Sequence, residues 1–118
     1  MRDFHDLKVW QRSHQLTLEI YQATQTFPKE EIYGLTSQIR RASASIPANL
    51  AEGCGKQGPT ELARYSQIAM GSASELEYHL LLSHDLHYLD DAHFTKLTTE
   101  LVEIRRMLNV FLHRLRSE

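Results

Sequence analysis

The pattern of apolar and polar positions is helical along almost the whole chain. Apolar residues return every three or four positions, and no stretch keeps the alternation of a half-buried β-strand. The pattern is clearest near the C-terminus, where seven apolar residues follow one another at intervals of three and four: Phe94, Leu97, Leu101, Ile104, Leu108, Phe111 and Leu115. That spacing places them on one stripe, which favours packing against neighbouring helices.

Three breaks divide this helical pattern. Pro28 disfavours helix in the residue before it, and residues 53–59 contain three glycines and a proline. A third break lies at about residues 87–90. The sequence therefore predicts four helices, at about residues 5–26, 31–52, 60–86 and 91–116.

The residues at these breaks also predict how the helices begin and end. Gly53 is the expected stop of the second helix, which leaves Cys54 in a flexible loop. Thr60 is the expected N-cap of the third helix, and Asp90 or Asp91 that of the fourth.

Short connections between long helices make neighbouring helices antiparallel. We therefore expect an all-α protein, an up-down-up-down four-helix bundle that forms a single domain over residues 1–118. Pro47 should bend the second helix, because it cannot donate to the carbonyl of Ser43. Gly71 lies among small residues of the third helix and is expected to allow close packing there.

The first helix carries more apolar surface than a small bundle can cover. Its residues without long polar side chains span about 220° of the circumference, whereas about 100° is usual for a surface helix. The apolar positions form two clusters, Leu7, Trp10, His14, Leu18 and Tyr21 on one side and Val9, Leu16, Ile20, Ala23 and Phe27 on the other. We expect a homo-oligomer with Trp10, Tyr21 and Phe27 at the interface, the alternative being cover by loops or chain ends.

Composition indicates a globular protein of the cytoplasm. The chain has 118 residues, of which 24% are charged, and a net charge of −2. Its longest aliphatic run is only Leu80 to Leu82, so we expect no membrane association, and the first residues lack a signal-peptide core. Cys54 is the single cysteine and cannot form an intrachain disulfide, which is typical of a reducing compartment.

The sequence offers no catalytic constellation, so we predict a protein without enzymatic activity or cofactor. It lacks the Glu-x-x-His pairs of a di-metal bundle and a phosphate-binding glycine loop after a strand. The segment from His84 to His93 is rich in His and Asp, but it spans a helix end, where such residues are more typical of a turn than of a metal site. His14 and His79 lie on apolar faces and are expected to be packed.

The last turns of the chain are basic. Arg105, Arg106, Arg114 and Arg116 are concentrated there, whereas residues 75–103 carry seven acids and one lysine. Cations favour a helix C-terminus in any case. The alternative is a nucleic-acid-binding surface, formed when several copies bring these four arginines together.

Several motifs, taken in order, resemble one family over about residues 4–115. They are Asp-Leu-Lys-Val-Trp-Gln from Asp6, Glu-x-Tyr-Gly-Leu-Thr from Glu31, Ser-Ile-Pro-Ala-Asn-Leu-Ala-Glu-Gly from Ser45 and Ile-Ala-x-Gly-Ser-Ala-x-Glu-Leu from Ile68. The chain is similar to bacterial four-helix bundle proteins encoded in 23S ribosomal RNA intervening sequences. The resemblance implies a homopentameric barrel and no enzymatic activity.

A related branch comprises the accessory variability determinants of diversity-generating retroelements, which bind a reverse transcriptase and nucleic acid through a basic surface. Arg40 and Arg41 match the Arg-Arg pair of the family, and one of them is expected to pair with Glu52 or Glu75. His87 stands where the family commonly has glycine, so we expect a positive φ angle there.

The function predicted from the sequence is therefore a non-enzymatic, homo-oligomeric scaffold or binding protein with RNA as a candidate partner. The alternative is a nucleic-acid-binding accessory protein that acts with a reverse transcriptase.

Overall fold

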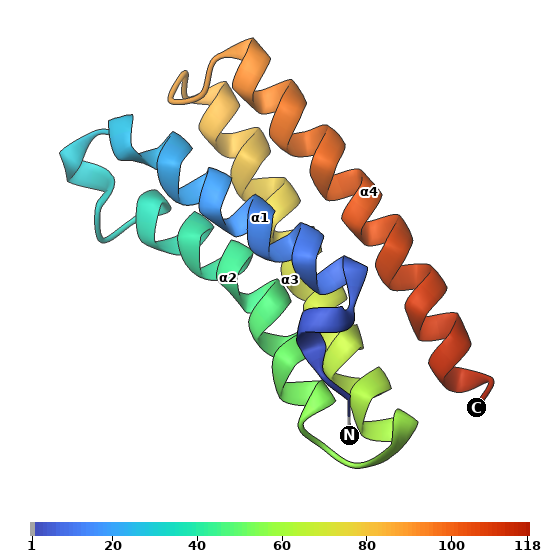
Figure 1. The fold of residues 1–118 in the computed structure, drawn as a ribbon. Coiled ribbons are helices and arrows are strands. Elements are labelled where there is room, and N and C mark those ends of the chain that lie inside the picture. Colours follow the sequence, from blue (N-terminus) through green and yellow to red (C-terminus); the bar gives the residue numbers. More distant parts are fainter. Residues whose placement is uncertain (1) are drawn as a thin grey trace.

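A computed structural model describes residues 2–118, which form four long helices running alternately up and down (Figure 1). The helices are α1 (Lys8–Ala23), α2 (Leu35–Cys54), α3 (Gly58–Asp85) and α4 (Asp91–Arg116). Three short 3-10 turns flank or connect them: η1 (Phe4–Asp6), η2 (Thr24–Thr26) and η3 (Lys29–Glu31). α1 and α3 lie diagonally across the bundle, each beside α2 and α4. The predicted all-α class is confirmed for the described residues.

One apolar core runs along the bundle axis. The stripe predicted for the last helix is confirmed, because five of its seven residues are buried and Phe94 and Phe111 are partly buried. The largest fully buried side chains come from all four helices: Leu16, Ile20, Ile39, Ile46, Leu50, Leu76, Leu80, Leu101, Ile104 and Leu108.

The turn between α2 and α3 differs from the prediction. α2 continues through Gly53 to Cys54, and α3 already begins at Gly58 rather than after Thr60. Gly53 packs so closely on α3 that a Cβ atom there would lie 2.8 Å from Cβ of Tyr65. The glycine is therefore a contact position and not a helix stop, and Cys54 lies in the core at 1% exposure instead of in a flexible loop.

Gly71 has the opposite environment from the one predicted. A Cβ atom at this position would have no neighbour within 4 Å, and the residue is exposed. Close packing of α2 on α3 occurs instead at Gly53 and at Ser45, whose hydroxyl lies 2.8 Å from that of Ser72.

Pro47 leaves the carbonyl of Ser43 without its helical donor. The Thr17 hydroxyl of α1 lies 3.0 Å from this carbonyl oxygen and 2.9 Å from that of Ser13, and its one hydrogen is shared between the two. Thr17 and Ser43 are buried. A hydroxyl on α1 thus compensates for a proline on α2, and this contact joins the two helices.

The turn between α3 and α4 follows the prediction. His87 has a φ angle of 65°, and the backbone N–H groups of Tyr88 and Leu89 donate to the carbonyl of Ser83, which closes the end of α3. Asp90 is the N-cap of α4 and accepts a 2.8 Å hydrogen bond from the backbone N–H of His93. This hydrogen bond holds the pKa of the Asp90 carboxyl below its ordinary value.

Candidate functional site

The structure separates the two apolar clusters of α1. Val9, Leu16 and Ile20 are buried against the other helices. In the other cluster, the one that contains Trp10 and His14, Leu18 is 51% exposed and Tyr21 44% exposed. Packing therefore decides which face of α1 stays exposed, a question that the sequence pattern left open.

Two further members of the cluster that contains Leu18 and Tyr21 form an aromatic stack. The imidazole of His14 lies parallel to the ring of Trp10, with 5.1 Å between the ring centroids. His14 is exposed and Trp10 only partly buried, so the expectation of a packed residue is wrong for His14. His79, by contrast, is mostly buried and bonds to Glu75 at 2.9 Å.

Phe27 does not belong to this exposed surface. Its side chain is only 7% exposed, and its ring packs at 5.4 Å from that of Tyr88. The extended backbone at Phe27 and Pro28 turns the ring back over the end of the bundle. Its predicted place in an oligomer interface is therefore wrong, because the chain itself covers it.

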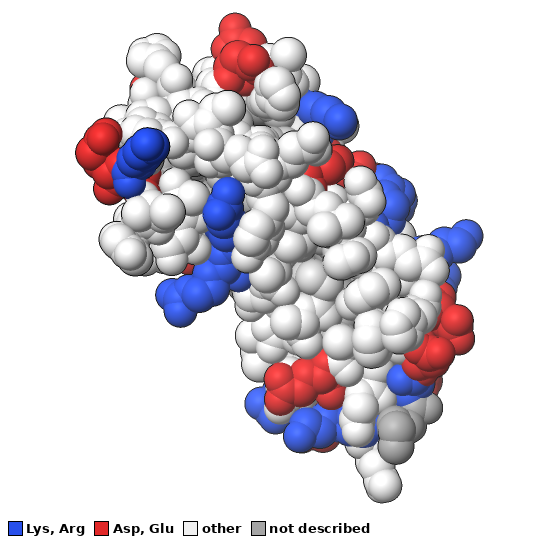
Figure 2. Space-filling model, turned by 60° about the vertical axis from the view of Figure 1, so that its left-hand side comes forward, with Lys and Arg blue, Asp and Glu red and all other residues white. Residues whose placement is uncertain are grey.

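The exposed cluster continues onto α2 as a surface with few charged residues. Ser37 and Ala44 of α2 line a shallow hollow together with Tyr21, and Arg40 and Arg41 line the same hollow. Figure 2 shows the wide uncharged area of this side of the molecule, with Lys, Arg, Asp and Glu around its margin. We call this surface the α1–α2 face, formed by Trp10, His14, Leu18, Tyr21, Ser37, Ala44 and Ala48.

Charged residues of α1 lie on its other side, toward α4. Arg12 pairs with Glu100 of α4 at 2.6 Å, and this hydrogen bond raises the pKa of the guanidinium. Glu19 lines a hollow together with residues of α4. α1 therefore directs its charge to one neighbour and leaves the α1–α2 face uncharged.

Arg40 lies at the margin of the α1–α2 face. Its guanidinium carbon is 4.8 Å from the centroid of the Tyr21 ring, and it donates to the Thr24 hydroxyl at 2.8 Å and the Tyr21 carbonyl at 3.2 Å. Within residues 2–118, the expected ion pair of Arg40 or Arg41 with Glu52 or Glu75 is not formed. A cation over an aromatic ring replaces it.

A second apolar surface lies on the opposite side of the bundle. Tyr78 and Leu81 of α3 and Val102 of α4 are each about half exposed, and the neighbouring Arg105–Glu77 ion pair brings these stretches of α3 and α4 side by side. We call these three residues the α3–α4 face.

The four arginines predicted to bind nucleic acid do not form one patch. Arg105 pairs with Glu77 of α3 at 2.6 Å, and Arg116 bonds to Gln67 of α3 at 3.0 Å. Arg106 bonds to Glu103, which holds the pKa of that carboxyl below its ordinary value. Arg114 has no ion-pair partner among residues 2–118. The structure thus divides the cluster between two sides of α4.

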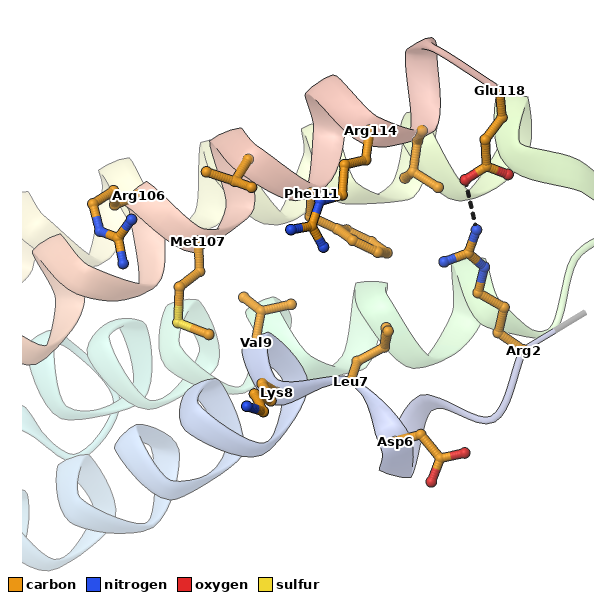
Figure 3. Close-up of a pocket in the computed structure, with 12 residues that line it drawn as sticks. Arg2, Asp6, Leu7, Lys8, Val9, Arg106, Met107, Phe111, Arg114 and Glu118 are labelled. Carbon is orange, nitrogen blue, oxygen red and sulfur yellow. Dashed lines mark hydrogen bonds and ion pairs between the residues drawn. The ribbon is translucent and has the colours of Figure 1, made fainter.

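A groove of about 590 Å³ lies between the start of the chain and the last turns of α4 (Figure 3). Its floor is apolar, formed by Leu7, Val9, Met107, Val110, Phe111 and Leu115. Its rim carries four cations, Arg2, Lys8, Arg106 and Arg114, and two carboxylates, Asp6 and Glu118. We call this feature the basic groove. Sequence reasoning missed it, because its two walls are about a hundred residues apart in the chain.

The His and Asp residues around the last turn make separate pairs. His84 lies 2.7 Å from Asp91 and stacks on Phe94, while His93 lies 2.8 Å from Asp90. Within the described residues, no three side chains of the metal-binding types converge. The His84–Asp91 pair links the end of α3 to the start of α4, and the His93–Asp90 pair lies within the first turn of α4.

Two further features concern the Cys54 thiol and the hydropathy of the helices. Burial raises the pKa of the Cys54 thiol, which keeps it protonated and a weak nucleophile. Over residues 2–118, none of the helices combines the length and the apolar character that crossing a bilayer requires.

The fold and its surfaces define a small all-α protein with two exposed apolar faces. Residues 5–110 match the family model described as 23S rRNA-intervening sequence protein, and the chain belongs to that family. A crystal structure of a protein with unknown function from the S23 ribosomal protein family of Bacteroides thetaiotaomicron has the same fold, with a TM-score of 0.82 and 24% identity. The match covers 89% of this chain and 95% of that one. The curated proteins compared with the chain include no match.

Proposed function

We propose that this protein is a non-enzymatic scaffold that works as a closed ring of identical copies. The α1–α2 face carries the proposal: Leu18 and Tyr21 are about half exposed on a surface whose charged residues lie at its margin. An exposed apolar patch of this kind marks an interaction site. Identical copies can associate through it without bringing like charges together.

The position of the second apolar face supports a ring rather than a two-fold dimer. Tyr78, Leu81 and Val102 lie on the side of the bundle opposite Leu18 and Tyr21. When one face binds a different face of the next copy, the contact is head-to-tail and closes into a ring at the right rotation. The resemblance in sequence implies five copies, and we propose that number here.

The experiment places a carboxylate on each face in turn. Leu18→Glu and Val102→Glu change half-exposed side chains, so the fold should tolerate both, whereas an unpaired charge buried in an interface costs several kcal/mol. We expect the unchanged protein to sediment as an oligomer and each variant as a monomer. Val110→Glu, at a third exposed apolar position, is the matched control and should leave the mass unchanged.

A mixture of the two variants distinguishes a ring from a dimer. Each variant retains one intact face, so a head-to-tail contact predicts that the mixture forms pairs with one copy of each variant. A two-fold contact through the α1–α2 face predicts that the Val102→Glu variant still self-associates. If the unchanged protein is a monomer at micromolar concentration, the scaffold proposal is wrong.

Nucleic-acid binding is the second candidate, including a role beside a reverse transcriptase. The family description, which names 23S rRNA, favours it, and a ring would gather Arg114 from every copy at one end. Labelled RNA and single-stranded DNA should then bind more weakly as the salt concentration is raised, and the Arg114→Glu variant should not bind them. Assembly remains our conclusion, because Arg105 and Arg106 are already paired with carboxylates.

A further inference from the structure

We propose that the basic groove is a docking site for an acidic amphipathic helix of a partner protein. Such a helix would lie between α1 and α4 with its apolar side on the floor and glutamate or aspartate on both flanks. The site is separate from the α1–α2 and α3–α4 faces, so the proposal does not depend on the ring.

The shape of the groove fits a helix better than a small molecule. The α4 wall runs from Arg106 to Leu115, a rise of about 14 Å, or two and a half helical turns. The groove is open to solvent, and Val110, one of the residues that line it, is 44% exposed. A small ligand is normally enclosed over most of its surface, whereas a docked helix is covered on one side only.

The floor residues have the spacing that a docked helix requires. Met107, Phe111 and Leu115 of α4 stand at intervals of four positions along one side of the groove, and Leu7 and Val9 lie on the other. A helix resting between two helices contacts both through apolar residues at the same intervals. About three apolar anchors of a partner would fit along this length.

The rim determines the charge of the partner. Lys8 on the α1 side and Arg114 on the α4 side have no ion-pair partner among residues 2–118. Arg2 is held by Glu118 at 2.8 Å, with its guanidinium carbon 5.8 Å from the centroid of the Phe111 ring. Free cations on both walls of a groove, in a chain of net charge −2, attract a helix that is acidic along both flanks.

The same residues disfavour an RNA as the occupant. The floor consists mostly of aliphatic side chains, which offer no hydrogen bonds to bases, and Phe111 is its only aromatic residue among those described. Base-stacking platforms and an unbroken positive surface, which single-stranded nucleic acids require, are both missing from this lining.

The experiment titrates the full-length protein into a fluorescently labelled peptide and follows anisotropy. The peptide has about 18 residues, enough to form a helix, with leucines along one side and glutamates beside them. A second peptide has lysine in place of every glutamate. We expect the acidic peptide to bind and the basic peptide not to bind, and we expect binding to weaken strongly as salt is raised.

Variants of the chain locate the site. Lys8→Glu with Arg114→Glu reverses the free charges, and Val110→Glu places a carboxylate on the floor; each should weaken peptide binding by about tenfold or more. Arg64→Glu, at an exposed arginine of α3 that does not line the groove, is the control and should leave binding unchanged. Circular dichroism of each variant verifies that the helices are intact.

Three results would overturn the proposal. The first is equal binding of the acidic and basic peptides, or binding that these variants leave intact. The second is binding of a single-stranded RNA oligonucleotide that the same variants abolish, while the acidic peptide does not bind. The third is an oligomer of lower mass for Val110→Glu or for the Lys8→Glu and Arg114→Glu double variant. Such a loss would mean that a second copy of the chain occupies the groove. The first two results do not depend on whether the α1–α2 face assembles a ring.

Discussion

At the scale of single residues, the contact between Thr17 and the Ser43 carbonyl shows how one side chain compensates for another. Pro47 removes a backbone donor inside α2, and a hydroxyl on a different helix supplies the replacement at 3.0 Å. A buried carbonyl without a donor is costly, so this hydroxyl stabilises the fold beyond its own packing.

Replacing Thr17 with valine therefore predicts a loss of stability although the side chain keeps its shape. We expect Thr17→Val to lower the free energy of unfolding by about 1–3 kcal/mol, because the Ser43 carbonyl is left without this donor. Urea denaturation followed by circular dichroism measures the change. Thr17→Ser keeps the hydroxyl and should cost less; equal losses for the two variants would show that the methyl group and not the hydrogen bond matters.

Two glycines make a matched pair with opposite expected signs. Gly53→Ala should destabilise the protein by about 1–3 kcal/mol, because the new Cβ would lie 2.8 Å from Cβ of Tyr65 and 2.9 Å from a methyl carbon of Leu62. Gly71→Ala should stabilise it by up to about 1 kcal/mol, because a helix interior favours alanine and no atom lies within 4 Å. Urea denaturation of both variants measures the signs, and a destabilised Gly71→Ala would indicate that another chain covers this part of α3.

At the scale of elements, the start of α4 depends on one carboxylate. The backbone N–H of His93 holds the pKa of Asp90 below its ordinary value, so the folded state favours the ionised form. The stabilisation is complete above the ordinary pKa of aspartate and is lost as the pH falls through the lowered pKa of the folded state.

This sign predicts a pH-dependent difference between two variants. Asp90→Asn can still cap the helix but does not titrate, so its melting temperature relative to the unchanged protein should rise as the pH falls from about 5 to 2. Asp90→Ala loses the cap and should melt at a lower temperature than Asp90→Asn near neutral pH. Thermal unfolding by circular dichroism over this range tests both, and a difference that does not vary with pH would contradict the role of the charge.

At the scale of the whole molecule, the proposed assembly and the proposed groove respond differently to salt. The α1–α2 face has no charged residue at its centre, so the mass of the oligomer should not change between about 0.05 and 1 M sodium chloride. Sedimentation velocity at both salt concentrations measures this. Dissociation at high salt would instead assign the contact to the charged margin, where Arg40 and Arg41 lie.

Sequence reasoning succeeded where a residue acts through its local geometry. Asp90 caps a helix and His87 adopts a positive φ angle because both depend on a few neighbours along the chain. It failed at Gly53 and Cys54 because a glycine near a helix end is read as a stop, whereas here it admits the side chain of Tyr65. A glycine that stops a helix and a glycine that contacts another helix look the same in the sequence, and only the packing of α3 shows that Gly53 is of the second kind.

By itself, the sequence determined four amphipathic helices, their antiparallel order and an excess of apolar surface on the first helix, because these follow from periodicity and from short connections. The tertiary structure alone decided that Leu18 and Tyr21 stay exposed while Phe27 is buried by Tyr88. It also placed the C-terminal arginines on two sides of α4, and it brought Arg114 and Lys8 to opposite walls of one groove. The physical reason is that periodicity states which residues share a face of one helix, whereas the neighbour of that face depends on contacts between distant parts of the chain.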